Sequence, residues 1–274
     1  MFSRIRCGVV CLMLRNSGVS ENIRSSIADA AQSKYELAIA LHEQDNIEEA
    51  TAQYEACVAL NPEHVEALYN LGNIKLAEGN TEAAKQNFEK VVEIHPSHHL
   101  ANYNLGFINY ERGNLMKAKK YFSVAVKSEE DDVDTWINLG LVMRDIGDRK
   151  GSIRAMEKAV EIEDTNTLAL YNLGSTYLQF GNMDKAILNF SKVVKYDSNH
   201  ADAYFNLGVA HQKTGQFKPA IQCYEKAASI EPVLKNDADM AVRSMRVYLA
   251  KSLKQAGGRW LPLRYIVAQT QSVV

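Results

Sequence analysis

Five asparagine side chains stand at one position of a repeated motif. They are spaced 34 residues apart, and each comes directly before a leucine: Asn70, Asn104, Asn138, Asn172 and Asn206. A side-chain amide carries two donors and an acceptor, so it can pair with both the N–H and the C=O of another chain's backbone. Five such amides on one surface would form a row that holds an extended peptide.

The neighbours of these asparagines are mostly large and apolar. The residue directly before the asparagine is aromatic in four repeats and Ile137 in the fifth: Tyr69, Tyr103, Tyr171 and Phe205. Three residues after the asparagine, on the same face of a helix, come Asn73 and Phe107 in two of the repeats. We expect such a surface to take a peptide with hydrophobic side chains.

Charged residues on the same helices favour a neutral-to-basic ligand over an acidic one. The acidic members outnumber the basic ones, Arg144 and Lys213, which offset them only in part: Glu66, Glu111, Asp134, Asp145 and Asp202.

The asparagines belong to a unit of 34 residues that occurs six times without insertion. The units are 31–64, 65–98, 99–132, 133–166, 167–200 and 201–234. Within each unit, apolar residues recur at spacings of three and four, which predicts helices. A glycine stands where the first helix must end in five of the units: Gly79, Gly113, Gly147, Gly181 and Gly215. Each unit is therefore predicted to be two antiparallel helices joined by a tight turn.

The pattern resembles the tetratricopeptide repeat family over residues 31–234. In the second unit it reads Tyr69-Asn70-Leu71-Gly72, Gly79-Asn80, Ala84, Phe88 and Pro96. The resemblance implies an all-α, right-handed superhelical solenoid of six helix pairs. It also implies that the asparagines face the concave surface, similar to the asparagine ladder in the repeat domain of O-linked N-acetylglucosamine transferase. The alternative is that asparagine is a consensus residue with a structural role, and the two are compatible.

Two departures from the repeat pattern are local. Asp45 replaces the turn glycine in the first unit, and Ser152 replaces the small alanine in the fourth. We expect these two units to be the least tightly packed. Some members of the family clamp acidic chaperone tails with lysine, but Tyr69 and its equivalents occupy the position that would need the first lysine, so this clamp is not expected.

The two ends of the chain differ from the repeats. Residues 21–30 continue a helix into the first repeat, and 235–256 are predicted to be a helix that caps the last one. Residues 1–20 carry three arginines and no acidic residue. They fit a plain leader, an organelle-targeting peptide or a secretory signal. A cytoplasmic location is favoured, and a mitochondrial or other organellar one stays open. Residues 257–274 form an apolar tail.

Catalytic and metal sites are not expected. The chain has no Gly-rich phosphate loop and no Ser/His/Asp or Cys/His arrangement, so we predict neither catalytic residues nor a cofactor nor a small-molecule substrate. His95, His98 and His99 cluster without a carboxylate or thiol at ligand spacing, so a metal is not predicted. The net charge is −2 and the repeats carry no basic stripe, which argues against nucleic acid. Membrane association is not indicated, and the oligomeric state is left open.

The sequence thus predicts a non-catalytic scaffold that binds an extended peptide or a helix of a partner protein in a concave groove. The alternative is a structural subunit that uses its convex face or its ends in a larger assembly, such as a ciliary transport, organelle import or anaphase-type complex.

Overall fold

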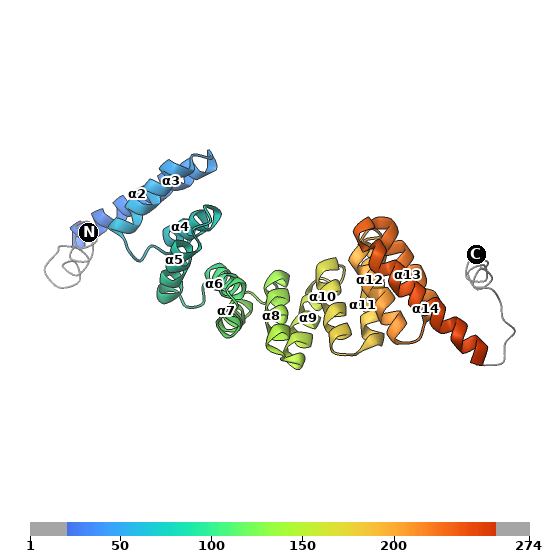
Figure 1. The fold of residues 1–274 in the computed structure, drawn as a ribbon. Helices are drawn as coiled ribbons and strands as arrows, with labels where there is room; N and C mark the ends of the chain where they lie inside the picture. The colour runs from blue at the N-terminus through green and yellow to red at the C-terminus, as the bar shows by residue number, and fades with distance from the viewer. Residues whose placement is uncertain (1–20, 256–274) are drawn as a thin grey trace. The chain divides into compact units, whose positions relative to one another are not determined.

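The computed structural model describes residues 21–255, and every regular element in that range is helical (Figure 1). The chain divides into two compact parts, Met1–Glu130 and Asp131–Val274, which we describe separately. The fold class predicted from the sequence, all-α with paired helices in series, is confirmed. The expectations for residues 1–20 and 257–274 fall outside the described residues.

The N-terminal part contains three helix pairs. The helices are α2 (Glu21–Glu43), α3 (Ile47–Leu60), α4 (Val65–Ala77), α5 (Thr81–Ile94), α6 (His99–Glu111) and α7 (Leu115–Ser128). Each helix packs against the next one along the chain. The first helix, α2, continues without a break from Glu21 into the first repeat and ends at Glu43.

The C-terminal part contains three further pairs and one additional helix. The elements are α8 (Val133–Ile146), α9 (Arg149–Ile162), α10 (Thr167–Gln179), α11 (Met183–Tyr196), α12 (Ala201–Lys213), α13 (Phe217–Ile230), the 3-10 turn η1 (Pro232–Leu234) and α14 (Lys235–Gln255). Ala238, Val242 and Met245 of α14 are buried in one cluster with Ile221 and Tyr224 of α13. The additional helix therefore covers the apolar side of the last pair.

The turn inside each repeat has a left-handed residue. Gly79 has φ 75°, and four other glycines at the same position have φ between 73° and 86°. In the first repeat Asp45 takes this conformation with φ 60°. Glycine has no Cβ to oppose positive φ, which explains why five of the six repeats use it there.

The two helices of a repeat approach closely because a glycine on the first helix meets a ring on the second. A Cβ added to Gly72 would lie 2.5 Å from Cε1 of Phe88. Phe88 is fully buried, with Leu68, Val91 and Leu105 in the same cluster. The ring thus fills the space that the missing side chain leaves.

Successive repeats are joined at the N-terminus of each first helix. A side chain at the last position of the preceding repeat caps this helix by accepting from a backbone N–H. The N-caps are His64, His98, Asp132, Asn166 and His200. In His98 the accepting atom is Nδ1, 3.2 Å from the backbone nitrogen of Ala101.

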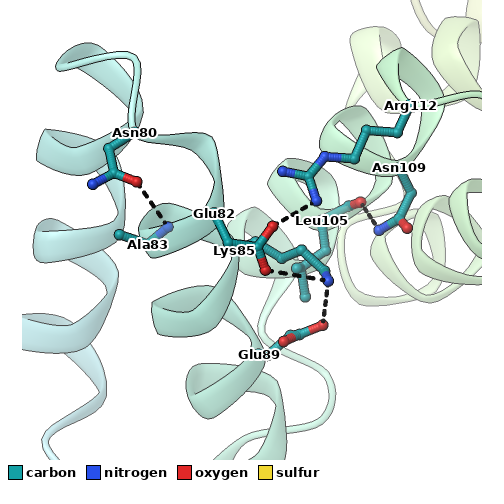
Figure 2. Close-up of polar contacts among 8 residues, drawn as sticks. All are labelled: Asn80, Glu82, Ala83, Lys85, Glu89, Leu105, Asn109 and Arg112. Atoms are coloured by element: carbon teal, nitrogen blue, oxygen red, sulfur yellow. Dashed lines mark hydrogen bonds and ion pairs between the residues drawn. The ribbon is translucent and has the colours of Figure 1, made fainter.

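Exposed polar contacts also connect the second and third repeats (Figure 2). Nη1 of Arg112, which follows α6, donates to Oε2 of Glu82 on α5 at 2.8 Å. This bond lowers the pKa of the Glu82 carboxyl. Lys85 lies between Glu82 and Glu89, at 4.0 and 3.5 Å. The carboxylates of these two glutamates thus pair with the cations of Lys85 and Arg112 on the surface of the N-terminal part.

The described cysteines, Cys57 and Cys223, are free thiols. Burial raises the pKa of each to about 11, so both stay protonated near neutral pH. None of the helices between residues 21 and 255 is long and apolar enough to span a bilayer.

Candidate peptide-binding face

The first helices of the N-terminal repeats share one solvent-facing side, which we call the N-terminal amide face. It is the side of α2, α4 and α6 that carries Asn70, Asn73 and Asn104, all partly exposed. Asn104 donates from Nδ2 to Oδ1 of Asn73 at 3.3 Å, so α4 and α6 present these amides side by side. Asn70 donates from Nδ2 to the hydroxyl of Tyr54 on α3 at 3.2 Å.

The C-terminal part has an equivalent C-terminal amide face, the side of α8, α10 and α12 that carries Asn138, Asn172 and Asn206. All three side chains are partly exposed. Asn206 donates to the hydroxyl of Tyr171 on α10 at 3.0 Å. Asn172 donates to the carbonyl of Leu168, one turn back on its own helix, at 2.9 Å. The amide N–H groups of both faces thus also serve the fold.

The aromatic residues before the asparagines are mainly packing residues. Tyr171 stacks on His200, with ring centroids 4.9 Å apart and planes 24° apart, and burial raises the pKa of its hydroxyl. The ring of Tyr69 likewise lies 5.3 Å from that of His98. Tyr103 and Phe205 each contact the buried ring of the second helix in their own repeat, at 5.8 and 5.1 Å. Each therefore offers a ligand only part of its ring.

The large apolar side chains that are exposed near the asparagines are Phe107, Leu100 and Leu168. Their exposed fractions are 41%, 47% and 54%. Phe107 was expected from the sequence, whereas Leu100 and Leu168 were not. Each of these leucines stands four residues before an asparagine, one helical turn away on the same face. A leucine four residues before the asparagine is therefore the sequence signal that places these two side chains on the same face.

The N-terminal amide face is also acidic. Four exposed carboxylates lie at its helix positions, from α2, α4 and α6: Glu36, Glu43, Glu66 and Glu111. Glu36 accepts from Nε2 of Gln32 at 3.0 Å, and Glu66 lies 3.3 Å from Nδ1 of His64. The repeat positions that these four carboxylates occupy carry neither lysine nor arginine in α2, α4 or α6.

The three histidines around the start of α6 are engaged within the fold. His98 caps α6, and Nδ1 of His99 lies 3.1 Å from the carbonyl oxygen of Ala125. Burial, followed by the proximity of His95, lowers the pKa of His98. Among the described residues, no three His, Cys, Asp or Glu side chains are grouped so as to hold a metal ion.

Family models agree with the repeat pattern. Models described as tetratricopeptide repeat match residues 31–64, 65–98, 133–166 and 201–232. A model described as TPR repeat matches residues 176–215. Together these matches cover more than half of the chain. A comparison with curated protein sequences gives no match.

Solved structures are similar over most of the described chain. The crystal structure of YrrB, titled a TPR protein with an unusual peptide-binding site, is 25% identical and has a TM-score of 0.62. The match covers 68% of this chain and 97% of YrrB. MamA from Desulfovibrio magneticus RS-1 is 20% identical with a TM-score of 0.57, over 62% and 96% of the two chains. PilF of Pseudomonas aeruginosa is 12% identical with a TM-score of 0.61, over 81% and 99%. The last two show the fold alone.

Proposed function

Because the chain belongs to the tetratricopeptide repeat family and is a protein-interaction scaffold, we propose that it binds an extended segment of a partner protein on its amide faces. Repeats of this family typically act without catalysis. The partner is a protein, and the asparagine side chains pair with its backbone.

The observation that carries this proposal is the combination of an amide and exposed apolar surface on one helix. Asn104 lies between Leu100 and Phe107, one turn from each, and both apolar side chains are more than two-fifths exposed. An amide recognises backbone in either direction, while apolar surface gains free energy when it is covered, about 25 cal/mol per Å². In the C-terminal part, Asn172 has the exposed Leu168 at the same spacing. YrrB, which is 25% identical and is described as having an unusual peptide-binding site, supports the same class of ligand.

The test is an affinity capture from lysate, read by mass spectrometry, with the full chain and the double variant Asn138→Ala/Asn172→Ala. Asn172 bonds to a carbonyl of its own helix, so its replacement removes a bond within α10 rather than one between helices. Gln222→Ala is the matched control, because it removes an exposed amide from the second helix α13. We expect the double variant to lose partners that the control keeps. A partner list unchanged in both variants would refute binding through the amide faces.

A second candidate is a structural subunit that contacts a larger assembly through the end of its C-terminal part. Val233 in η1 and Met240 on α14 are 73% and 62% exposed, so two large apolar side chains at this end of the repeats are open to a partner. The same capture separates the two functions, because Met240→Ser would remove partners that the asparagine variant keeps.

A further inference from the structure

The helix α6 presents two apolar side chains on either side of an amide. Leu100 comes four residues before Asn104 and Phe107 three residues after it, so all three lie on one side of the helix. Peptide backbone paired with Asn104 would therefore have apolar surface on both sides. A partner gains most from this arrangement when it carries hydrophobic side chains next to the paired backbone.

Exposed acidic groups occupy the same side of α6 and of the first helices that precede it. Glu111 lies one turn beyond Phe107 on α6. The bond from Asn104 to Asn73 places the same side of α4 directly beside α6. Three further exposed carboxylates come from α4 and α2: Glu66, Glu36 and Glu43. The face thus combines apolar surface on α6 with four carboxylates on α2, α4 and α6, which we call the acidic border.

Nearby basic residues offset these four carboxylates only in part. Lys34 on α2 keeps its charge, because its Nζ donates to the neutral amide oxygen Oε1 of Gln53 at 3.0 Å. Lys75 pairs with Glu78 at 2.9 Å, and Arg112 with Glu82 at 2.8 Å. The partner's own cations are then the natural counterions of the acidic border.

We infer that the partner of the N-terminal amide face is a peptide segment with hydrophobic anchors flanked by lysine or arginine. This inference rests on the proposed function and specifies its ligand. Opposite charge at a rim speeds association and selects the partner, whereas an acidic peptide would meet like charge. The hydrophobic anchors supply most of the affinity and the basic flanks most of the selectivity.

The first experiment selects random linear peptides displayed on phage against the full-length protein at roughly 0.15 M salt. We expect enriched sequences in which hydrophobic residues are flanked by Lys or Arg. Enriched peptides without a basic bias, or with an acidic one, would overturn the inference while leaving peptide binding intact. Failure to enrich any peptide would overturn the inference and the proposed function together.

The second experiment measures the affinity of the best enriched peptide by fluorescence anisotropy. Glu66→Gln/Glu111→Gln should weaken binding about two- to fivefold for each carboxylate removed, and less at high salt. Phe107→Ala should weaken it about tenfold. The control Glu55→Gln/Glu93→Gln makes the same charge change at exposed positions on the second helices α3 and α5. Equal weakening by both glutamine pairs would assign the effect to net charge and refute the acidic border.

Discussion

The asparagine side chain at this position of the repeat can serve two purposes at once. Asn206 donates one N–H to the hydroxyl of Tyr171 on the neighbouring first helix, and Asn70 donates one to the hydroxyl of Tyr54 on α3. Each amide has a second N–H and a carbonyl oxygen with two lone pairs. The structural role and the proposed ligand role therefore use different atoms of one side chain, and neither excludes the other.

A polar residue is buried at one point where a repeat departs from its pattern. Ser152 occupies the position of the small alanine and is fully buried, and its hydroxyl has no hydrogen-bond partner among the described residues. A buried hydroxyl without a partner keeps its full desolvation cost.

We therefore predict that Ser152→Ala stabilises the protein by about 0.5–2 kcal/mol. The alanine matches Ala84 and Ala118 at the same position in other repeats, so no space is lost. Urea denaturation measures the change in the free energy of unfolding. Ser229→Ala, which removes an exposed hydroxyl from α13, should change it little. A destabilised Ser152→Ala would mean that the hydroxyl has a partner.

At the scale of the element, the N-caps determine how each first helix begins. His98 accepts from the N–H of Ala101 through Nδ1, which requires that this ring nitrogen carry no proton. Burial, then the nearby His95, lowers the pKa of His98 below its ordinary value of 6.5. The native state consequently binds this proton less readily than the unfolded state. The neutral His98 side chain therefore contributes its full share to the free energy of unfolding above pH 6.5. This contribution is lost as the pH falls through the pKa of His98 in the native state.

We predict that His98→Asn makes the protein less sensitive to acid as the pH falls below 6.5. Asparagine already caps α10 at the equivalent position, where Oδ1 of Asn166 accepts from Ala169 at 3.0 Å, so the cap is kept while the titration is removed. The melting temperature measured at several pH values gives the comparison. Parallel pH profiles for the wild type and the variant would show that this histidine does not couple folding to pH.

Much of the element scale could be predicted from the sequence. The 34-residue period gives six helix pairs because glycine, small alanine and ring recur at fixed positions, and each has a local steric reason. The exposed surface was harder to predict. The sequence predicts that Tyr171 contacts a ligand, and it does not indicate that the ring also stacks on His200 at the end of its repeat. Leu168 is exposed although its type suggests burial. Such outcomes depend on how the helices pack in three dimensions, which the repeated pattern does not specify.

At the scale of the whole molecule, each repeat contacts mainly its neighbours in the chain. The free energy of unfolding is therefore approximately a sum of contributions from the repeats and from the interfaces between neighbouring repeats. A change that harms one repeat should therefore act locally.

We predict that Gly72→Ala, whose new Cβ would lie 2.5 Å from the ring of Phe88, costs about 1–3 kcal/mol. Amide hydrogen exchange should rise in α4 and α5 and in the adjoining helices, while α10 to α13 keep their protection. Gly174→Ala is the reciprocal control, because it brings a Cβ to 2.9 Å from the ring of Phe190 in the fifth repeat. A uniform rise along the chain in both variants would contradict the division of stability among repeats.

Partner proteins are proposed to lie on the amide faces, and site-specific photo-crosslinking locates them without relying on a loss of binding. A benzophenone amino acid is placed at the exposed Leu168 on α10, one turn from Asn172, or, in the matched control, at the exposed Gln222 on the second helix α13. After irradiation in lysate, we expect discrete crosslinked partners from position 168 and none from position 222. Crosslinks from position 222 alone would contradict this proposal and assign partner binding to the second helices.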